Sequence, residues 1–152
     1  GMCGEEQRNN MGTEIRPELS EKNEYYLPKN RYYELKYFCF QYPDWCKAYH
    51  SIDSYSKGQL DIYSYTGQHG DPTMEAAAKR ELYFRKMNVV EQTAFATDSS
   101  LASYILKGVT SGASYDFLKA RLNIPCGRST YYKFYRRFFW LLDTAQNKQM
   151  ML

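Results

Sequence analysis

The chain has 152 residues, which is long enough for one domain with a hydrophobic core and short for two. Apolar residues make up 43% and charged residues 24%, a globular composition that excludes a chain disordered throughout. The net charge of +3 is too small to argue by itself for a nucleic-acid partner, so the distribution of the charge matters more.

The basic charge is concentrated near the C-terminus. Residues 1–112 carry 13 Lys and Arg against 15 Asp and Glu, a net charge of −2. Residues 113–152 carry 7 basic and 2 acidic residues, a net charge of +5. An asymmetry of this kind indicates an anionic partner for the last quarter of the chain.

The cysteines and the apolar runs bear on the class of protein. The four cysteines include no Cys-X-X-Cys pair, and the chain is neither short nor rich in cysteine, so we expect no disulfide framework. No signal-peptide pattern is present, and no apolar run approaches 18 residues. The sequence therefore predicts a soluble, cytoplasmic protein without membrane contact.

The first part of the chain predicts a polar arm and then an aromatic helix. Residues 1–24 are polar and lack periodicity, so we expect a disordered arm. In YYLPKNRYYELKYFCFQY (residues 25–42), Pro28 suits the approach to a helix and Asn30 is the candidate N-cap. The apolar residues that follow point all round a helical wheel, which is typical of a helix buried on most sides, with a second subunit as one way to cover it.

A short helix and a loop region come next. Pro43 with Asp44 restarts the chain as a second helix that ends near Ile52. Residues 51–71 are rich in Ser, Gly and Asp and form a loop region, in which the alternation of QLDIYSY predicts a short β-arm near residues 59–65.

The strongest helix start in the chain lies at Asp71. This residue is a good N-cap, Pro72 occupies the first helical position, and Glu75 in the first turn complements the helix dipole. Two apolar faces follow, formed by Met74, Ala78, Leu82, Val89 and Ala96 and by Tyr83, Met87, Val90 and Ala94. We expect such a helix, about 25 residues long, in the middle of a bundle or at a dimer seam.

Two shorter helices complete the region before the basic segment. Asp98 or Ser99 caps SLASYILKGV, which the residues TSG end, and Ser114 caps YDFLKARL. The sequence thus predicts an all-α fold, a multi-helix bundle that ends in a helix-turn-helix at about residues 113–143. A single helical domain is expected over residues 25–152.

The basic segment NIPCGRSTYYKFYRRFFWLL (residues 123–142) combines four basic side chains with seven aromatic rings. On a helical wheel its two kinds of residue separate. One side gathers Tyr131, Tyr135, Phe138 and Leu142, flanked by Phe134, Leu141, Phe139 and Tyr132. The other side gathers Ser129, Lys133, Arg136, Arg137 and Trp140. We infer that the aromatic side docks on the domain and that the basic side faces a polyanion.

The residues just upstream complete a helix-turn-helix pattern. A short helix holds Leu118 and Leu122 one turn apart, Ile124 lies in the turn, and the basic helix follows. In this geometry the second helix enters the major groove, where its N-terminal residues meet base edges and basic residues neutralise phosphates. The pattern predicts sequence-specific binding of double-stranded DNA. A basic face that is merely solvated is the alternative.

The stretches DPTMEAAAKR and YILKGVTSGASYDFLKARLNIPCGRSTYYKFYRRFFWLL resemble phage-encoded transcriptional regulators of the ArpU/RinA kind. The C-terminal half is similar to the helix-turn-helix of sigma-factor region 4. The resemblance implies a regulator of phage or prophage genes, with Ser129, Thr130, Lys133 and Arg137 facing the groove. Two features differ from the family pattern: the turn NIPCG is longer, and Lys119 stands where a small residue is usual, next to Ala120.

The expected DNA contacts therefore come from both helices. Phosphate contacts are expected from Arg128, Lys133, Arg136 and Arg137, with help from Lys119 and Arg121. We further expect a homodimer and a contact with RNA polymerase. Trp140 is covered by the N-terminal helices or contacts a second subunit or the polymerase.

Other chemistry is weakly indicated. Cys39, Cys46 and His50 would share one face of a continuous helix as a zinc set, but Pro43 between them breaks such a helix. Cys126 beside Arg128 is a candidate for a lowered thiol pKa, with a structural turn residue as the alternative. Neither histidine lies in a catalytic pattern, so we expect no enzyme, no metal and no cofactor. The rival functions are a protein-interaction module and a phage packaging or assembly accessory.

Overall fold

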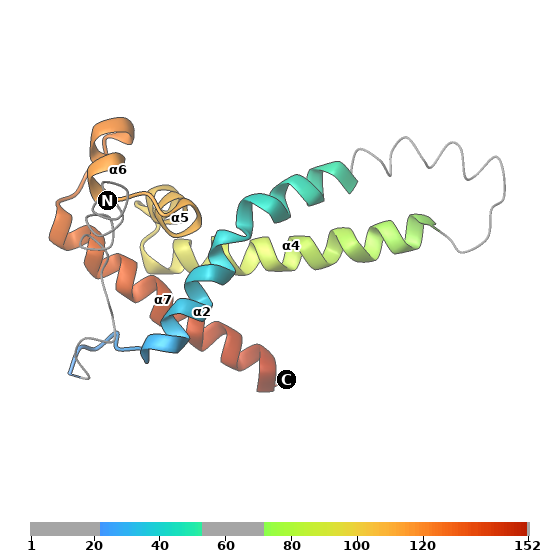
Figure 1. Ribbon diagram of the computed structural model, residues 1–152, viewed down its shortest axis with the longest axis horizontal. Helices are drawn as coiled ribbons and strands as arrows, with labels where there is room; N and C mark the ends of the chain where they lie inside the picture. The colour runs from blue at the N-terminus through green and yellow to red at the C-terminus, as the bar shows by residue number, and fades with distance from the viewer. Residues whose placement is uncertain (1–21, 53–71, 152) are drawn as a thin grey trace, which may run out of the picture. The chain divides into compact units, whose positions relative to one another are not determined.

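The computed structural model describes residues 22–52 and 72–151, and all the regular structure in these residues is helical (Figure 1). The helices are α2 (Lys29–Phe40), α4 (Pro72–Thr97), α5 (Ala102–Ser111), α6 (Tyr115–Leu122) and α7 (Arg128–Met151), with a further helical stretch at residues 42–52. The all-α prediction is confirmed. The predicted β-arm at residues 59–65 and almost all of the predicted N-terminal arm lie outside the described residues.

Contacts divide the chain into two compact units. The first, which we call the core unit, joins Gly1–Phe40 to Val90–Leu152. The second, the hairpin unit, is Gln41–Val89. The expectation of a single domain over residues 25–152 stays a prediction.

The start of α2 differs from the prediction by a small shift. The helix begins at Lys29, and the carbonyl oxygen of Pro28 accepts the first bond, from the Tyr32 amide at 3.0 Å. Asn30 is therefore inside the first turn, and its assignment as N-cap was wrong. The next helix begins at residue 42 instead of Asp44, which places Pro43 in a first turn, where its missing N–H costs nothing.

The later boundaries follow the sequence signals closely. Helix α4 begins at Pro72 as expected, while Asp71 lies outside the described residues. The predicted cap of α5 at Asp98 or Ser99 was wrong, because Leu101 is the N-cap and has no side-chain cap bond. Asp98 instead closes the turn before the helix, where its Oδ1 accepts from the amides of Ser100 at 2.9 Å and Leu101 at 3.0 Å. Gly112 ends α5 with a φ of 73°, the left-handed conformation that favours glycine.

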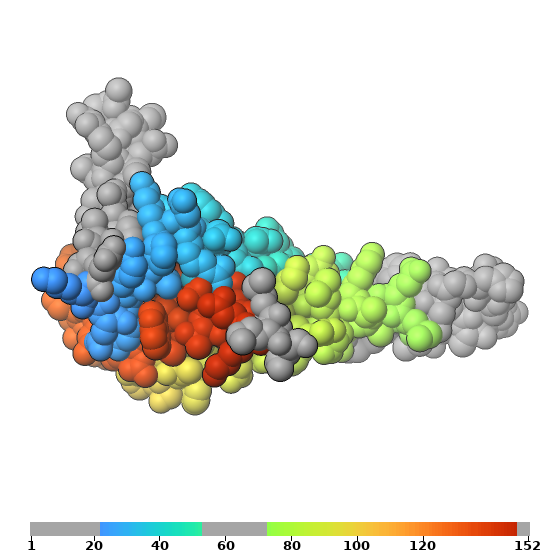
Figure 2. All heavy atoms as spheres, turned by 90° about the horizontal axis from the view of Figure 1, so that it is seen from below, coloured from blue at the N-terminus to red at the C-terminus, as the bar shows by residue number. Residues whose placement is uncertain are grey.

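The core unit is built around the aromatic side of α7. All four residues expected to dock this helix are buried: Tyr131, Tyr135, Phe138 and Leu142. On the α2 side, the hydroxyl groups of Tyr32 and Tyr135 share a buried hydrogen bond of 3.1 Å. The Tyr32 ring also meets the edge of Phe139 at 5.2 Å between ring centres. Helices α2 and α7 thus pack against one another: they cross in Figure 1, and their atoms adjoin in Figure 2.

Helix α2 is less deeply buried than its composition suggested. Its buried residues, Tyr32, Leu35 and Cys39, form one stripe against α5 and α7. Tyr37 on the opposite side is 59% exposed and packs against rings of its own helix, Tyr33 and Phe40. The expectation that this helix is buried on most sides was therefore wrong, because its buried residues form one stripe.

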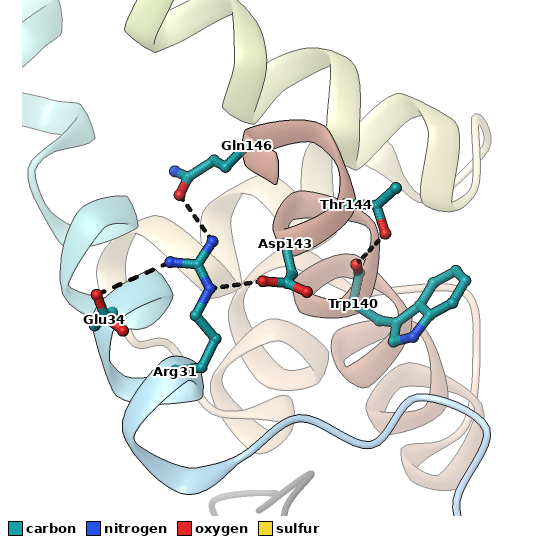
Figure 3. Close-up of polar contacts among 6 residues, drawn as sticks. All are labelled: Arg31, Glu34, Trp140, Asp143, Thr144 and Gln146. Carbon is teal, nitrogen blue, oxygen red and sulfur yellow. Dashed lines mark hydrogen bonds and ion pairs between the residues drawn. The ribbon is translucent and has the colours of Figure 1, made fainter. Parts of the chain in front are cut away.

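A polar clamp joins α2 to the C-terminal part of α7 (Figure 3). The Nε of Arg31 donates to Oδ1 of Asp143 at 2.6 Å, and an Nη of the same guanidinium donates to Oε1 of Gln146 at 3.2 Å. About three quarters of each charged side chain is buried. The clamp fixes the register of α2 along α7 beyond the aromatic core.

In the hairpin unit, residues 42–52 run antiparallel to the first part of α4. Trp45 is buried beneath the ammonium group of Lys86, and Arg80 lies over the Tyr49 ring and donates to its hydroxyl oxygen at 2.8 Å. Of the predicted apolar faces, the one that begins with Met74 and Leu82 is exposed there. This part of α4 therefore does not lie in the middle of a bundle.

Within the described part of the chain, no helix has both the length and the apolar character of a membrane span.

Candidate nucleic-acid interface

The first helix of the predicted motif is defined by capping groups at both ends. At its start, the Ser114 hydroxyl oxygen accepts a hydrogen bond from the Phe117 amide at 3.1 Å. At its end, Asn123 adopts a left-handed conformation with a φ of 53°, which reverses the chain. Basic residues in the last turn, Lys119 and Arg121, complement the helix dipole. The predicted cap at Ser114 is confirmed.

One buried side chain and three hydrogen bonds hold the turn between α6 and α7. The buried side chain of Ile124 anchors it, and the Ile124 amide donates to the Leu118 carbonyl at 3.2 Å. The Tyr115 hydroxyl donates to the Cys126 carbonyl at 2.6 Å, and the Lys119 ammonium donates to the Ile124 carbonyl at 3.3 Å. The turn is longer than in the family pattern, and hydrogen bonds from α6 hold it in place. The side chain of Lys119 supplies one of these bonds.

Helix α7 is fixed to α6 by its second turn. The hydroxyl oxygen of the buried Tyr132 accepts from the Tyr115 amide at 3.3 Å, and the Tyr131 ring lies 6.0 Å from the Tyr115 ring. On its α5 side, Tyr131 meets Gly108, where a side chain would overlap its hydroxyl group. The angle between the two helices thus depends on Tyr131 and Tyr132.

The outward side of α7 at its N-terminus is polar and exposed. The predicted contact residues Arg128, Ser129, Thr130 and Lys133 are all exposed, whereas the intervening tyrosines are buried. Lys119 and Arg121 on α6 are exposed as well. The first two turns of α7 therefore offer hydroxyl groups and cations to a partner, with a rigid aromatic face behind them.

Two of the predicted contacts are less accessible. Arg136 and Arg137 are half-buried, and Nε of Arg136 is buried without a hydrogen-bond partner among the described residues. The Ser100 hydroxyl lowers the pKa of Asp98 most, and the amides of Leu101 and Ser100 and the charge of Arg137 lower it further. These two arginines lie beside the exposed turns and are less accessible to a partner.

Arg128 has partners within the protein that the sequence analysis missed. Its Nη2 donates to Oδ1 of Asp116 on α6, and its guanidinium carbon lies 5.2 Å from the centre of the Tyr115 ring. The spacing of twelve residues across a turn gives no periodic signal. The one available sign was that Asp116 is one of two acidic residues after residue 112.

Trp140 lies farther along α7 and is 39% exposed. Its ring packs at 5.9 Å from Tyr25, in the segment that precedes α2, and its carbonyl oxygen accepts from the Thr144 hydroxyl at 3.1 Å (Figure 3). Tyr25 thus covers part of the indole, and the remainder of its exposed surface is available to a partner.

Two of the described cysteines, Cys126 and Cys39, have a raised thiol pKa. Burial raises the pKa of Cys126, so the lowered thiol pKa considered for this residue is wrong, and the pKa of Cys39 is raised strongly for the same reason. Cys39 belongs to the buried stripe of α2, whereas His50 is exposed on the hairpin unit. Among the described residues, no group of three or more His, Cys, Asp or Glu could hold a metal ion.

Comparison of the chain with protein-family models, with curated proteins and with solved structures finds no match.

Proposed function

We propose that the chain binds double-stranded DNA through α6 and α7, as a transcriptional regulator of the phage or prophage type. The observation that carries the proposal is the start of α7, where Arg128, Ser129, Thr130 and Lys133 are exposed together while the opposite side of the same turns is buried. A helix held in this way can enter a groove without losing its support. A cytoplasmic location follows from this task.

The exposed turns divide the work of recognition. Ser129 and Thr130 lie in the first turn of α7, where side chains of a recognition helix meet base edges. Arg128 and Lys133 neutralise phosphates, helped by Lys119 and Arg121 from α6. Arg136 and Arg137 reach phosphates only at the flanks because they are half-buried. Such a module buries roughly 600–1,000 Å² of protein surface on DNA.

A second candidate function is a protein-interaction module, for phage assembly or packaging. Exposed Leu82 and Phe84 on the hairpin unit favour it, because large apolar side chains on a helix surface often mark a protein partner. The same residues are compatible with a homodimer of the DNA-binding protein. The exposed part of Trp140 is a candidate contact for RNA polymerase.

The test is fluorescence anisotropy of labelled duplex DNA, with genomic fragments and random sequence, at about 50 and 200 mM salt. The variant Arg121→Gln/Lys133→Gln/Arg128→Gln removes three exposed charges of the interface. Its matched control is Lys29→Gln/Lys47→Gln/Lys148→Gln, which removes three exposed charges elsewhere. For about four phosphate contacts, we expect wild-type affinity to fall on the order of a hundredfold across this salt range.

The control variant should bind like the wild type, and the interface variant should lose most of its affinity with unchanged helicity. Absence of binding by folded wild-type protein at the lower salt concentration would reject the DNA function. The interaction function would then be examined first, with Leu82 and Phe84 as the residues to change.

A further inference from the structure

The first residue of α7 carries a cation that already has an anionic partner in the free protein. Arg128 donates to the carboxylate of Asp116, and both side chains are largely exposed, to 51% and 67% respectively. An exposed ion pair of this kind contributes little to stability, because water screens it. An anion that binds Arg128 more strongly can therefore displace Asp116 when it approaches the start of α7.

We propose that Asp116 is an internal counter-ion of the DNA interface, which holds Arg128 in the free protein and is displaced from it by a backbone phosphate. The inference rests on the proposed DNA function and concerns the regulation of its affinity. Its basis is that one acidic residue of the basic C-terminal quarter is placed on the first cation of the candidate recognition helix.

The geometry allows this exchange without a rearrangement of Arg128. The guanidinium group lies over the Tyr115 ring, and Tyr115 is itself fixed by its hydrogen bond to the Cys126 carbonyl. This cation–π contact does not depend on Asp116. A guanidinium group has five N–H donors, so a phosphate can bind to it while the ring keeps its plane in place.

The exchange has a cost that salt makes measurable. Once a phosphate binds Arg128, the Asp116 carboxylate stays beside a polyanion and has to attract a cation from solution. DNA binding then releases about one cation fewer than the number of phosphate contacts implies, so the dependence of affinity on salt becomes shallower. Asp116 in this way weakens binding to any phosphate backbone, whatever its sequence.

The experiment compares Asp116→Asn with the wild type by anisotropy of a random-sequence duplex over a salt series. The matched control is Glu34→Gln, which also removes one exposed carboxylate beside an arginine, Arg31. Arg31 bonds to Asp143, fifteen residues along α7 from Arg128, or about 22 Å. This separation is about twice the screening length at 0.1 M salt.

We expect Asp116→Asn to bind DNA about two- to fivefold more tightly at 0.1 M salt, which corresponds to the upper range of an exposed ion pair. The slope of log affinity against log salt should steepen by about one. Glu34→Gln should leave both quantities unchanged, and Asp116→Asn should have no comparable effect in an Arg128→Gln background.

The possible failures are distinguishable. Wild-type binding with equal or weaker binding by Asp116→Asn would overturn the inference and leave the DNA function standing, since Asp116 would then position Arg128 for the phosphate. An equal gain in Glu34→Gln would also overturn it, as an effect of net charge alone. If neither the wild type nor any folded variant binds DNA, the proposed function fails and the inference fails with it.

Discussion

Arg31 and Asp143 are 112 residues apart in the chain and are joined by a hydrogen bond of 2.6 Å between the Nε of one and the carboxylate of the other. Together with the bond from Arg31 to Gln146, this contact links segments that lie far apart in the chain. It ties α2 to the part of α7 that lies beyond the candidate DNA interface. The support of that interface thus depends on a residue near the start of the described chain.

Removal of one partner of this pair should cost more stability than removal of both. With about a quarter of each side chain exposed, Asp143→Asn should lower the free energy of unfolding by about 1–2 kcal/mol, because it leaves a largely buried guanidinium group without its charge partner. Arg31→Met is the other single change, and Arg31→Met/Asp143→Asn should lose less stability than Asp143→Asn alone. Urea denaturation followed by circular dichroism measures all four proteins.

Glu34→Gln is the control for this cycle, because Glu34 lies 3.9 Å from the same guanidinium but is 68% exposed. Its effect should stay within about 0.5 kcal/mol. Strict additivity of the Arg31 and Asp143 changes would show that the two side chains do not stabilise one another.

Gly108 on α5 should resist replacement by alanine, although alanine normally favours a helix by about 1 kcal/mol. An added Cβ would overlap the hydroxyl oxygen of the buried Tyr131 and lie 3.2 Å from its Cζ. Overpacking of this kind costs about 1–3 kcal/mol, so we expect Gly108→Ala to lower the melting temperature. Gly127→Ala is the steric control, since nothing lies within 4 Å of its added Cβ.

The same site predicts a rescue. The Tyr131 hydroxyl has no hydrogen-bond partner among the described residues, so Tyr131→Phe alone should cost almost nothing or should stabilise. Gly108→Ala/Tyr131→Phe should recover a large part of the loss. A double variant as unstable as Gly108→Ala alone would mean that the backbone of α5, and not the hydroxyl group, is the obstacle.

The cap of α6 should be worth about 1 kcal/mol to the core unit. Ser114→Ala removes the oxygen that accepts from the Phe117 amide, and an N-cap change of this type typically costs this amount. Ser114→Asp keeps an acceptor and adds a charge at the positive end of the helix, so it should retain wild-type stability. Equal loss in the two variants would show that the cap bond does not matter. Thermal unfolding by circular dichroism decides between these results.

The features that could be predicted from the sequence were those set by local signals. Gly112 and Pro72 mark helix ends through their backbone preferences and Ser114 does so through its side-chain oxygen, and the structure places helix ends there. The two sides of α7 also followed from the spacing of its residues, because helical periodicity fixes the direction of each side chain. Helix-end residues and helical spacing both lie within a few residues of the features that they predict.

Contacts between helices were beyond the sequence. A helical wheel placed Arg136 and Arg137 on the polar side of α7. It could not show that neighbouring segments leave both side chains half-buried. The partners of Arg31 and Arg128 lie across a tertiary contact and across a turn, where no periodic pattern connects the residues. The division into two units was hidden because α4 runs without a break through the boundary between them.

Alkaline unfolding should report on the tyrosine pair at the centre of the core unit. Burial, followed by the neighbouring Tyr32, raises the pKa of Tyr135 well above its ordinary value of 10.0. A group whose pKa is raised in the folded state contributes stability that is complete below its unfolded pKa and is lost as the pH rises above it. The wild type should therefore lose stability above about pH 10, by up to about 1.4 kcal/mol per pH unit for this group.

Tyr135→Phe removes the titrating hydroxyl group together with its hydrogen bond to Tyr32. The variant should be less stable than the wild type at pH 8 by about 1 kcal/mol and should approach or overtake it between about pH 10 and 11. Tyr37→Phe is the control, because Tyr37 is 59% exposed on the same helix as Tyr32. Its urea unfolding curves should follow the wild type at every pH. Parallel pH dependence of Tyr135→Phe and the wild type would show that the Tyr135 hydroxyl does not limit alkaline stability.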